Sequence, residues 1–312
     1  MAVHNGLPYV RRAMDSILEQ TLRDIEFVIV DDASADATPE VLASYSDPRI
    51  VMVKNETNMG LTRSLNRGIA ASRAPLIARQ DADDFSFPDR LSRQVHYLES
   101  HSNIGLVGSG ALWIDANDSV IQEWRPMCDP VEIQRVLLES IPFLHGTFMF
   151  RRDCVNDIGG GYNEAMPVAQ DCDLLLRISE RWDVANVPDM LYAHRRHAGS
   201  ITTKRASDQE SYLRSAQRAA ISRRLAYGWR RLGLSRNAVP EWVISADRHW
   251  LALRYGWWSA AARAANKKAA LSLLLIALAL DPIAPEWRRY ALGVAKRKLS
   301  LLCARSGEAC RA

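Results

Sequence analysis

Three aspartates lie within four positions of the stretch LIARQDADDFSFPDRL, residues 76–91. Asp81, Asp83 and Asp84 directly follow a short apolar run that has the pattern of a buried strand. Carboxylates this close together repel one another, and neutral pH leaves them ionised unless their charge is compensated. Either water screens these aspartates on a loop, or a cation lies between them.

A second acidic pair follows another apolar run, because IEFVIVDD (25–32) ends in Asp31 and Asp32. Hard divalent cations such as Mg²⁺ and Mn²⁺ take oxygen ligands, and Mg²⁺ is usually held by one or two carboxylates together with substrate phosphates. The D-x-D spacing of Asp81 and Asp83 places both side chains on one side of an extended segment. That spacing also occurs by chance, so its position after a predicted strand is what favours a binding site.

The elements that must position these carboxylates alternate along the first 110 residues. Strand-like runs lie at 25–32, 49–54, 75–81 and 104–110, and helix-like segments lie at 7–21, 38–46, 61–73 and 87–100. This alternation predicts an α/β fold with a mostly parallel sheet flanked by helices. Ligands of such sheets bind beyond the carboxyl ends of the strands, so we expect both acidic groups at one rim of the sheet.

Composition fits a globular protein of one large domain or two modest ones. The chain has 312 residues, 48% of them hydrophobic and 24% charged. Its five cysteines are odd in number and lack metal-like spacing, which favours a reducing compartment and a cytoplasmic location. The opening MAVHNGLPYV has no pattern of a signal peptide. The longest apolar run, at 269–280, is too short for a spanning helix, which needs about 20 residues.

Charge divides the chain into two regions. Residues 204–312 carry a net charge of +14 and six of the nine tryptophans, whereas residues 1–203 carry −10. The basic region has helix-like spacing, so we expect helices there, either lying at the inner face of an anionic membrane or packed with a merely basic outer face. No nucleic-acid-binding motif accompanies the charge, and we expect no nucleic-acid partner.

Seven ordered motifs resemble the family 2 glycosyltransferases with the GT-A fold. They are VHNGLPYVRRAMDSILEQT, IEFVIVDDASADATPEVL, NETNMGLTRSLNRGIAAS, LIARQDADDFSFPDRL, HGTFMFRRD, GGGYNEAMPVAQDCDLLLRIS and YAHRRHAGSIT. The resemblance covers residues 2–203. It implies a GT-A domain at 1–203, with a nucleotide-sugar half at about 1–110 and an acceptor half at about 111–203, followed by a helical region at 204–312.

The resemblance also implies an enzyme, an inverting glycosyltransferase that takes a sugar from a nucleotide diphosphate, with UDP- or dTDP-sugars favoured, to a glycan or lipid-linked acceptor. Mn²⁺ or Mg²⁺ would serve as cofactor. The roles implied are donor binding for Asn5, Asp31, Asp32, Asp81 and Asp83; metal binding for Asp83 and His197; general base for Asp171; and acceptor or auxiliary contacts for Asp84, His145 and Asp173.

Plainer interpretations compete with these roles. Asp171 and Asp173 precede the helix-like DLLLRISER, where carboxylates stabilise a helix N-terminus. The glycines at 159–161 fit a flexible turn better than a phosphate cradle, since no P-loop lysine follows. Gln170 stands where the family usually has Glu, which predicts a weaker base at Asp171. Only Met1, Ala2 and Val3 remain of the family's first strand, so we expect that strand to begin upstream of Met1.

Two other functions compete with that of a glycosyltransferase. A non-catalytic nucleotide-sugar-binding protein, acting through its basic helical tail, fits the shortened first strand. A set of four carboxylates, Asp32, Asp81, Asp83 and Asp171, favours the enzyme instead. A nucleotidyltransferase would need a glycine-rich, basic triphosphate loop near the first strand, and none is present.

Overall fold

The structure is a computed structural model that describes residues 1–197, 199–200, 205–235, 241–263 and 266–281. Contacts between residues divide the chain into two compact units. The first comprises Met1–Ile133 with Ser140–Ala220, and the second comprises Gln134–Glu139 with the chain from Ile221 onward. The expected division at residue 203 stays a prediction, and each unit is described by itself.

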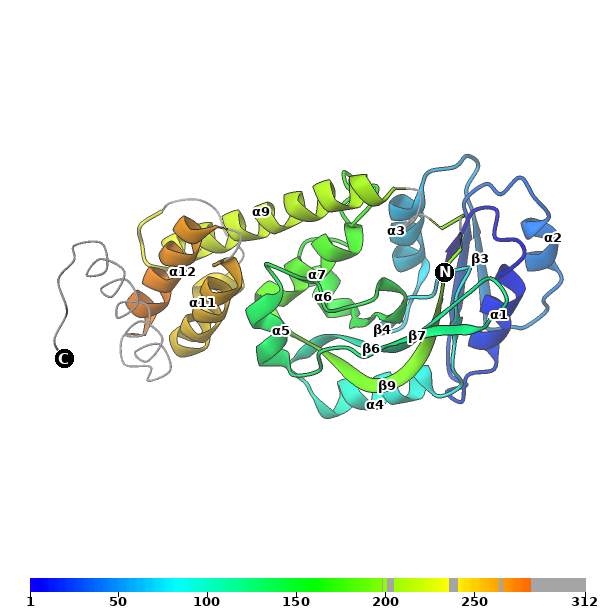
Figure 1. Ribbon diagram of the computed structural model, residues 1–312, viewed down its shortest axis with the longest axis horizontal. Coiled ribbons are helices and arrows are strands. Elements are labelled where there is room, and N and C mark those ends of the chain that lie inside the picture. Colours follow the sequence, from blue (N-terminus) through cyan, green and yellow to red (C-terminus); the bar gives the residue numbers. More distant parts are fainter. Residues whose placement is uncertain (198, 201–204, 236–240, 264–265, 282–312) are drawn as a thin grey trace. The chain divides into compact units, whose positions relative to one another are not determined.

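The described elements follow one another as labelled in Figure 1. The strands are β1 (Ala2–Val3), β2 (Phe27–Asp31), β3 (Ile50–Lys54), β4 (Leu76–Ala78), β5 (Phe85–Ser86), β6 (Ile104–Ile114), β7 (Val120–Trp124), β8 (Met149–Arg151) and β9 (Asp183–Arg195). The helices are α1 (Val10–Leu18), α2 (Thr38–Ala43), α3 (Leu61–Ala71), α4 (Arg90–Ser100), α5 (Pro130–Val136), the 3₁₀ helix η1 (His145–Thr147), α6 (Arg152–Asp157), α7 (Gln170–Arg181), α9 (Ala206–Arg231), α10 (Glu241–Ser245), α11 (Arg248–Ala262) and α12 (Lys267–Leu280).

A three-stranded parallel sheet carries the first acidic pair. β1, β2 and β3 lie side by side in that order, with Ala2 opposite Val30 and Phe27 opposite Ile50. All five residues of β2 are buried, as a run of β-branched side chains between two layers requires. The apolar stripe of α1, including Met14 and Ile17, packs on this sheet. The sheet therefore holds the end of β2, and with it Asp31, in a rigid frame.

A second sheet carries the aspartates of the D-x-D stretch. Its strands run in the order β4-β8-β6-β9-β5, and β7 pairs with β6. Helices α4 and α7 cover opposite faces of the long strands β6 and β9 (Figure 1). Asp81, Asp83 and Asp84 lie in the loop from β4 to β5, beyond the carboxyl end of β4 as expected. The expectation that both acidic groups lie at the rim of one sheet is wrong, because β2 and β4 belong to different sheets.

The α/β class is confirmed. A mostly parallel sheet was expected, but among the described strands parallel pairing is limited to β1–β2–β3 and to β6 with β9. The other pairs of the second sheet are antiparallel. One cause is local. The Asp115 carboxylate accepts hydrogen bonds from the N–H groups of Asn117 and Ser119, and this tight turn returns the chain as β7 antiparallel to β6.

The second unit confirms the expected helical C-terminal region. α11 and α12 pack on each other, and the Asn266 side chain accepts a hydrogen bond from the Ala269 N–H at the start of α12. Within this unit Arg224 and Arg254 are buried and lie over the rings of Trp258 and Trp250, at 4.4 Å from each centroid. Two of the positive charges of the basic region are therefore buried inside the unit. Among the described residues, no helix combines the length and hydropathy needed to span a bilayer.

Candidate active site

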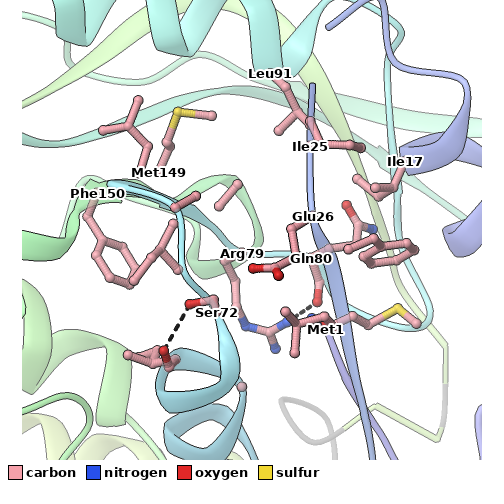
Figure 2. A pocket seen from close by; sticks show the side chains of 18 of the residues that line it. Met1, Ile17, Ile25, Glu26, Ser72, Arg79, Gln80, Leu91, Met149 and Phe150 are labelled. Atoms are coloured by element: carbon pink, nitrogen blue, oxygen red, sulfur yellow. Dashed lines mark hydrogen bonds between the residues drawn. The ribbon is translucent and has the colours of Figure 1, made fainter. Parts of the chain in front are cut away.

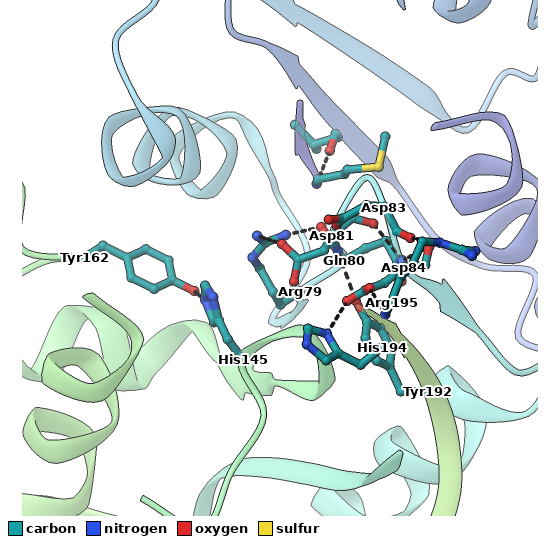
Figure 3. Close-up of polar contacts among 12 residues, drawn as sticks. Arg79, Gln80, Asp81, Asp83, Asp84, His145, Tyr162, Tyr192, His194 and Arg195 are labelled. Atoms are coloured by element: carbon teal, nitrogen blue, oxygen red, sulfur yellow. Dashed lines mark hydrogen bonds and ion pairs between the residues drawn. The ribbon is translucent and has the colours of Figure 1, made fainter. Parts of the chain in front are cut away.

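Asp81 is neutralised from within the protein. The buried Arg79 guanidinium donates to the Asp81 carboxylate and to the Gln80 carbonyl (Figure 3). Burial works to raise the pKa of Asp81, but Arg79 outweighs it and holds that pKa below the usual value. The Asp81 N–H donates to the hydroxyl of Tyr192 at 3.2 Å, which fixes the backbone of the loop. Asp81 is therefore a fixed, ionised carboxylate at the site.

Asp84 ties the loop to β9. Its side chain is buried and accepts the Arg195 N–H at 2.7 Å and the His194 Nδ1–H at 3.0 Å. Burial raises the pKa of Asp84 to about 6, and the hydrogen bond from His194 only partly opposes this. Burial works to lower the pKa of His194, but the same bond to Asp84 raises it. Asp84 thus anchors the loop, and its expected auxiliary role in acceptor binding stays a prediction.

Asp83 is the most exposed of the three carboxylates, with 37% of its side chain accessible. Its Oδ2 lies 2.9 Å from Nε2 of His197, on the segment that follows β9. Two contacts fix this pair, because Arg195 Nε donates to the Asp83 carbonyl at 2.8 Å and the Tyr9 ring packs 5.2 Å from that of His197. The carboxylate that the sequence assigns to a metal is therefore free enough to reach a ligand.

The donor set at Asp83 fits a divalent cation only if substrate supplies further ligands. A carboxylate oxygen and an imidazole nitrogen converge here, and within the described part of the chain no third His, Cys, Asp or Glu joins them to form a closed metal cluster. Mg²⁺ and Mn²⁺ accept such an open set, because phosphate oxygens and water complete their coordination. The residues present fit a metal that is held jointly by protein and diphosphate.

The N-terminal loops are organised by Asn5 and Asp32. The Asn5 side-chain oxygen accepts the Ala35 N–H at 2.8 Å, which folds residues 34–36 over the end of β2. Asp32 accepts the N–H groups of Met59 at 2.7 Å and Gly60 at 2.8 Å, at the N-terminus of α3. Burial works to raise the pKa of Asp32, but these bonds and one from Asn55 lower it.

Asp32 is thus largely engaged by the protein's own donors. Its Oδ1 already accepts from Asn55 and Met59 and its Oδ2 accepts from Gly60, so capacity for a nucleotide base is expected at Oδ2. The neighbouring Asp31 accepts the Ser34 N–H at 3.1 Å. Donor binding by these carboxylates stays a prediction.

The acceptor side gathers residues from η1, α7 and the loop before it. Nε2 of His145 lies 2.8 Å from the Tyr162 hydroxyl (Figure 3). The charges of Asp171 and Asp81 both act on these two groups. Burial, reinforced by Arg79, lowers the pKa of His145 to about 4, so its imidazole is neutral at pH 7. The structure thus brings the predicted base beside a neutral, hydrogen-bonded pair.

Asp173 has a different position from Asp171. It is buried and pairs with Arg177 at 2.8 Å, one helical turn later on α7. Arg177 in turn donates to the Gly160 carbonyl at 3.2 Å and to the Gly161 carbonyl at 2.5 Å, so the glycine turn is bound to α7. Gly159 and Gly160 have positive φ, which fits a turn. A catalytic role for Asp173 stays a prediction.

Several residues at the site were not singled out from the sequence. They are Arg79, Tyr192, Arg195, Tyr9 and Tyr162. The one available signal was Arg79, a cation inside a strand-like run next to the aspartates. The others contact the site through partners distant in sequence. Lys204, a cation that follows His197 by seven positions in the sequence, lies outside the described residues.

The fold is that of the GT-A class of glycosyltransferases. The chain is similar to residues 1–349 of S. aureus TarS in complex with UDP-GlcNAc, with a TM-score of 0.60 over 99% of this chain and 91% of that one, at 15% identity. It is also similar to the mannosyltransferase PcManGT from Pyrobaculum calidifontis, in complex with GDP-Man and Mn²⁺, with a TM-score of 0.51 over 93% and 81% of the two chains, at 20% identity.

Within that class, the chain belongs to glycosyl transferase family 2, whose model matches residues 1–159. It is 35% identical to EpsE of Bacillus subtilis (strain 168) over 58% of this chain and 65% of EpsE, just under two thirds of that relative's length. It is 32% identical to the O-antigen biosynthesis glycosyltransferase WbnJ of Escherichia coli over 63% of this chain and 78% of WbnJ.

Proposed function

We propose that this protein is an inverting glycosyltransferase, which moves a sugar from a nucleoside diphosphate to a hydroxyl of a glycan or lipid-linked acceptor. The observation that carries the proposal is the convergence of three separate segments. The loop 79–84 meets the segment after β9 at the contact between Asp83 and His197, and the charges of Asp81 and of Asp171, at the start of α7, both act on His145 and Tyr162. Family membership supports the reaction class.

Asp83 and His197 would hold Mn²⁺ or Mg²⁺ against the donor diphosphate. The bound metal would supply electrostatic stabilisation of the charge that develops on the departing nucleoside diphosphate. Asp81 has its charge compensated by Arg79, so it contributes hydrogen-bond acceptors for a ribose or sugar hydroxyl without adding repulsion toward phosphate. The Mn²⁺ complex of PcManGT supports this choice of cofactor.

Asp171 would act as the general base. Its carboxylate takes the proton from the acceptor hydroxyl while that oxygen forms its bond to the anomeric carbon and the bond to the diphosphate oxygen breaks on the opposite face. Attack opposite to the leaving group inverts the anomeric centre. His145, held by Tyr162, is neutral at pH 7, so its imidazole adds no positive charge near Asp171 and can hydrogen-bond the acceptor.

The similar proteins indicate only the chemical class of the donor and of the acceptor. The similar structures are complexes with UDP-GlcNAc and with GDP-Man, so a UDP- or dTDP-sugar is our first choice of donor and a GDP-sugar is the comparison. Similarity to WbnJ supports an acceptor in cell-envelope polysaccharide synthesis, reached from the cytoplasmic side of the membrane.

Calorimetric titration tests the donor site directly. UDP, dTDP and GDP are each titrated into the wild type, with and without Mn²⁺, and into Asp83→Ala. We expect one nucleotide to bind in a Mn²⁺-dependent manner and to lose at least about tenfold in affinity in Asp83→Ala, because one charge-assisted metal ligand is removed. Glu40→Gln, an exposed carboxylate on α2, is the control. If the folded protein binds none of the three, the proposal fails. If it binds but transfers no sugar, it is the non-catalytic binding protein.

A further inference from the structure

An arginine that stacks on a tryptophan lies just beyond the end of β9. The central carbon of the Arg196 guanidinium lies 3.6 Å from the centre of the Trp113 ring on β6, and the Arg196 side chain is exposed. The Arg196 N–H donates to the Ile114 carbonyl at 2.8 Å, which continues the pairing of β9 with β6. Within the described part of the chain, this guanidinium makes no hydrogen bond or ion pair. Arg196 is therefore a positioned cation whose hydrogen-bond donors are available.

The preceding residue, Arg195, differs from Arg196 in all these respects. Its side chain is buried, Nε and one terminal nitrogen donate to the carbonyls of Asp83 and Asp115, each at 2.8 Å, and the other terminal nitrogen pairs with Asp118. Arg195 thus holds the loops together through all three of its nitrogens. Since Arg196 makes none of these contacts, its charge is not needed to hold the loops together.

Side chains alternate between the two faces of β9, and this alternation separates the metal side of the site from the acceptor side. Arg195 and His197 are two positions apart and both pack against Tyr9. The Arg195 guanidinium lies 4.3 Å from the centre of the Tyr9 ring, and the His197 ring lies 5.2 Å from it. His197 also contacts Asp83, the carboxylate proposed to hold the metal. This face therefore belongs to the donor and its metal.

Arg196 lies on the opposite face, toward the proposed acceptor side. Trp113, which Arg196 contacts, is the partner of His194 in the pairing of β6 with β9, and His194 lies two positions before Arg196. Tyr192 lies two positions further back, and Gly146 of η1 packs against it. Because η1 also supplies the imidazole proposed to bind the acceptor, Arg196 lies along the face that the acceptor would contact.

The cavity of the N-terminal unit is a separate space. It has a volume of about 720 Å³ and lies between β2 and β4 (Figure 2). Ile17, Leu91 and Met149 contribute apolar walls, and neither Trp113 nor Arg196 is among the described residues that line it. An acceptor that reaches Arg196 therefore lies outside this cavity, at the carboxyl ends of β6 and β9, where ligands of α/β sheets bind.

We propose that Arg196, held by Trp113, binds an anionic group of the acceptor, so that the acceptor is an acidic glycan bearing a carboxylate or a phosphate. This inference rests on the proposed function, because it assigns a binding role within the acceptor side of the same site. A guanidinium presents a fork of N–H donors that matches two oxygens of either group, and stacking on a ring leaves that edge free. The ring also holds the guanidinium in place, which reduces the freedom lost on binding.

Binding of simple sugars tests this inference without the acceptor or the nucleotide. Glucose, glucuronate and glucose 6-phosphate are titrated at millimolar concentrations into the full chain. Relaxation of the sugar's own protons measures Kd, and the indole N–H resonance of Trp113, identified as the one missing in Trp113→Phe, reports where the sugar binds. The matched control is Arg125→Gln, because Arg125 at the end of β7 is also exposed but is paired with Glu123.

The wild type should bind at least one of the two anions about tenfold more tightly than glucose, with a shift of the Trp113 resonance. Arg196→Gln should weaken that binding by at least about tenfold, because a charge-assisted pair is lost. Arg196→Lys should recover only part of it, since an ammonium lacks the planar fork. Trp113→Leu should weaken it by about threefold or more, whereas Trp113→Phe keeps a ring for stacking. Arg125→Gln should bind as the wild type does. A preference for glucuronate identifies a carboxylate on the acceptor, and a preference for glucose 6-phosphate identifies a phosphate.

Three results would overturn the inference: no binding of either anion, equal binding of glucose and the anions, or equal binding by the wild type and Arg196→Gln. Thermal unfolding checks that each variant is folded. The nucleotide titration with Mn²⁺ separates this inference from the proposed function. Arg196→Gln should bind nucleotide within about threefold of the wild type, and a larger loss would assign Arg196 to the donor diphosphate instead. If the wild type binds no nucleotide, the proposed function fails while the anion titration still measures Arg196.

Discussion

At the scale of single residues, the three crowded aspartates occupy three different environments. Arg79 neutralises Asp81, burial with His194 fixes Asp84, and Asp83 remains accessible beside His197. The mutual repulsion of the cluster is therefore relieved mostly inside the protein. Of the three, Asp83 is the accessible carboxylate with capacity for a cation, so its loss should weaken the Mn²⁺-dependent part of nucleotide binding.

Replacing Asp171 tests the base separately from the donor site. We expect Asp171→Asn to lower kcat by about 10²–10⁴-fold, because the amide cannot accept the acceptor's proton. The donor Kd should stay within about threefold of the wild type, since none of the metal and donor contacts are altered. Release of nucleoside diphosphate measures kcat, and calorimetry measures Kd. Retention of more than half the activity would remove Asp171 from the role of base.

His145 predicts a pH dependence of stability. Burial lowers its pKa in the folded protein to about 4, below its ordinary value near 6.5. A depressed pKa contributes stability that is complete above pH 6.5 and is lost as pH falls toward 4, so this residue should destabilise the protein by about 2 kcal/mol between pH 7.5 and pH 4.5. Urea unfolding at both pH values measures the change. His145→Gln should reduce it and the exposed control His96→Gln should not; equal losses in all three proteins would contradict the assignment.

At the scale of elements, the site depends on close contact between η1 and β9. Gly146 of η1 lies against Tyr192, whose ring stacks under Arg90 and whose hydroxyl accepts the Asp81 N–H. A Cβ at position 146 would lie 2.4 Å from the Tyr192 hydroxyl oxygen. A glycine is therefore required at position 146, because Tyr192 leaves no room for a side chain there. Through Tyr192, this close packing in the acceptor half also affects the backbone of the donor loop.

Gly146→Ala should destabilise the fold by about 1–3 kcal/mol, because the extra methyl forces Tyr192 aside in a packed core. It should also weaken nucleotide binding, since Tyr192 no longer fixes the Asp81 backbone. Gly68→Ala in α3 is the matched control. Its Cβ would contact only Val30 at 3.4 Å, and helix propensity should make it neutral or stabilising by up to about 1 kcal/mol. Chemical denaturation and calorimetry measure the two effects; if Gly146→Ala behaved like Gly68→Ala in both, the proximity argument would be wrong.

At the scale of the whole molecule, the two ends of the chain differ in charge. Residues 204–312 carry +14 and residues 1–203 carry −10. Arg224 and Arg254 are buried against tryptophans and therefore cannot contact a membrane surface, whereas Lys267 and Lys268 at the start of α12 are exposed. Any attraction to an anionic surface must come from such exposed cations, each of which contributes about 1 kcal/mol close to the membrane.

Vesicle sedimentation tests this attraction. We expect the protein to bind vesicles containing anionic lipid at 0.1 M salt, to release them at about 0.5 M, and to ignore neutral vesicles, because screening shortens the range of exposed charges. Lys267→Glu combined with Lys268→Glu should reduce the bound fraction severalfold. Lys54→Glu at the exposed end of β3 should not. Binding that is insensitive to salt and to all these changes would exclude an electrostatic contact.

The sequence by itself was sufficient for the α/β class, the GT-A family and the helical C-terminal region. Those properties depend on local patterns, namely β-branched runs that end in aspartates, and motifs in a fixed order. Such patterns can be recognised without knowing which distant residues are in contact. Most strand and helix positions in the first 110 residues followed for the same reason, with ends that differ by a few residues.

Only the tertiary structure decided the pairing of the strands and the state of each carboxylate. The antiparallel order of the second sheet depends on turns such as that at Asp115, and the partners of Asp83 and Asp84 come from 114 and 110 residues away. Arg79 neutralises a neighbour two positions along because burial holds both side chains together. The charge and accessibility of a side chain are set by what packs around it, and the packing partners here come from parts of the chain that no local pattern connects.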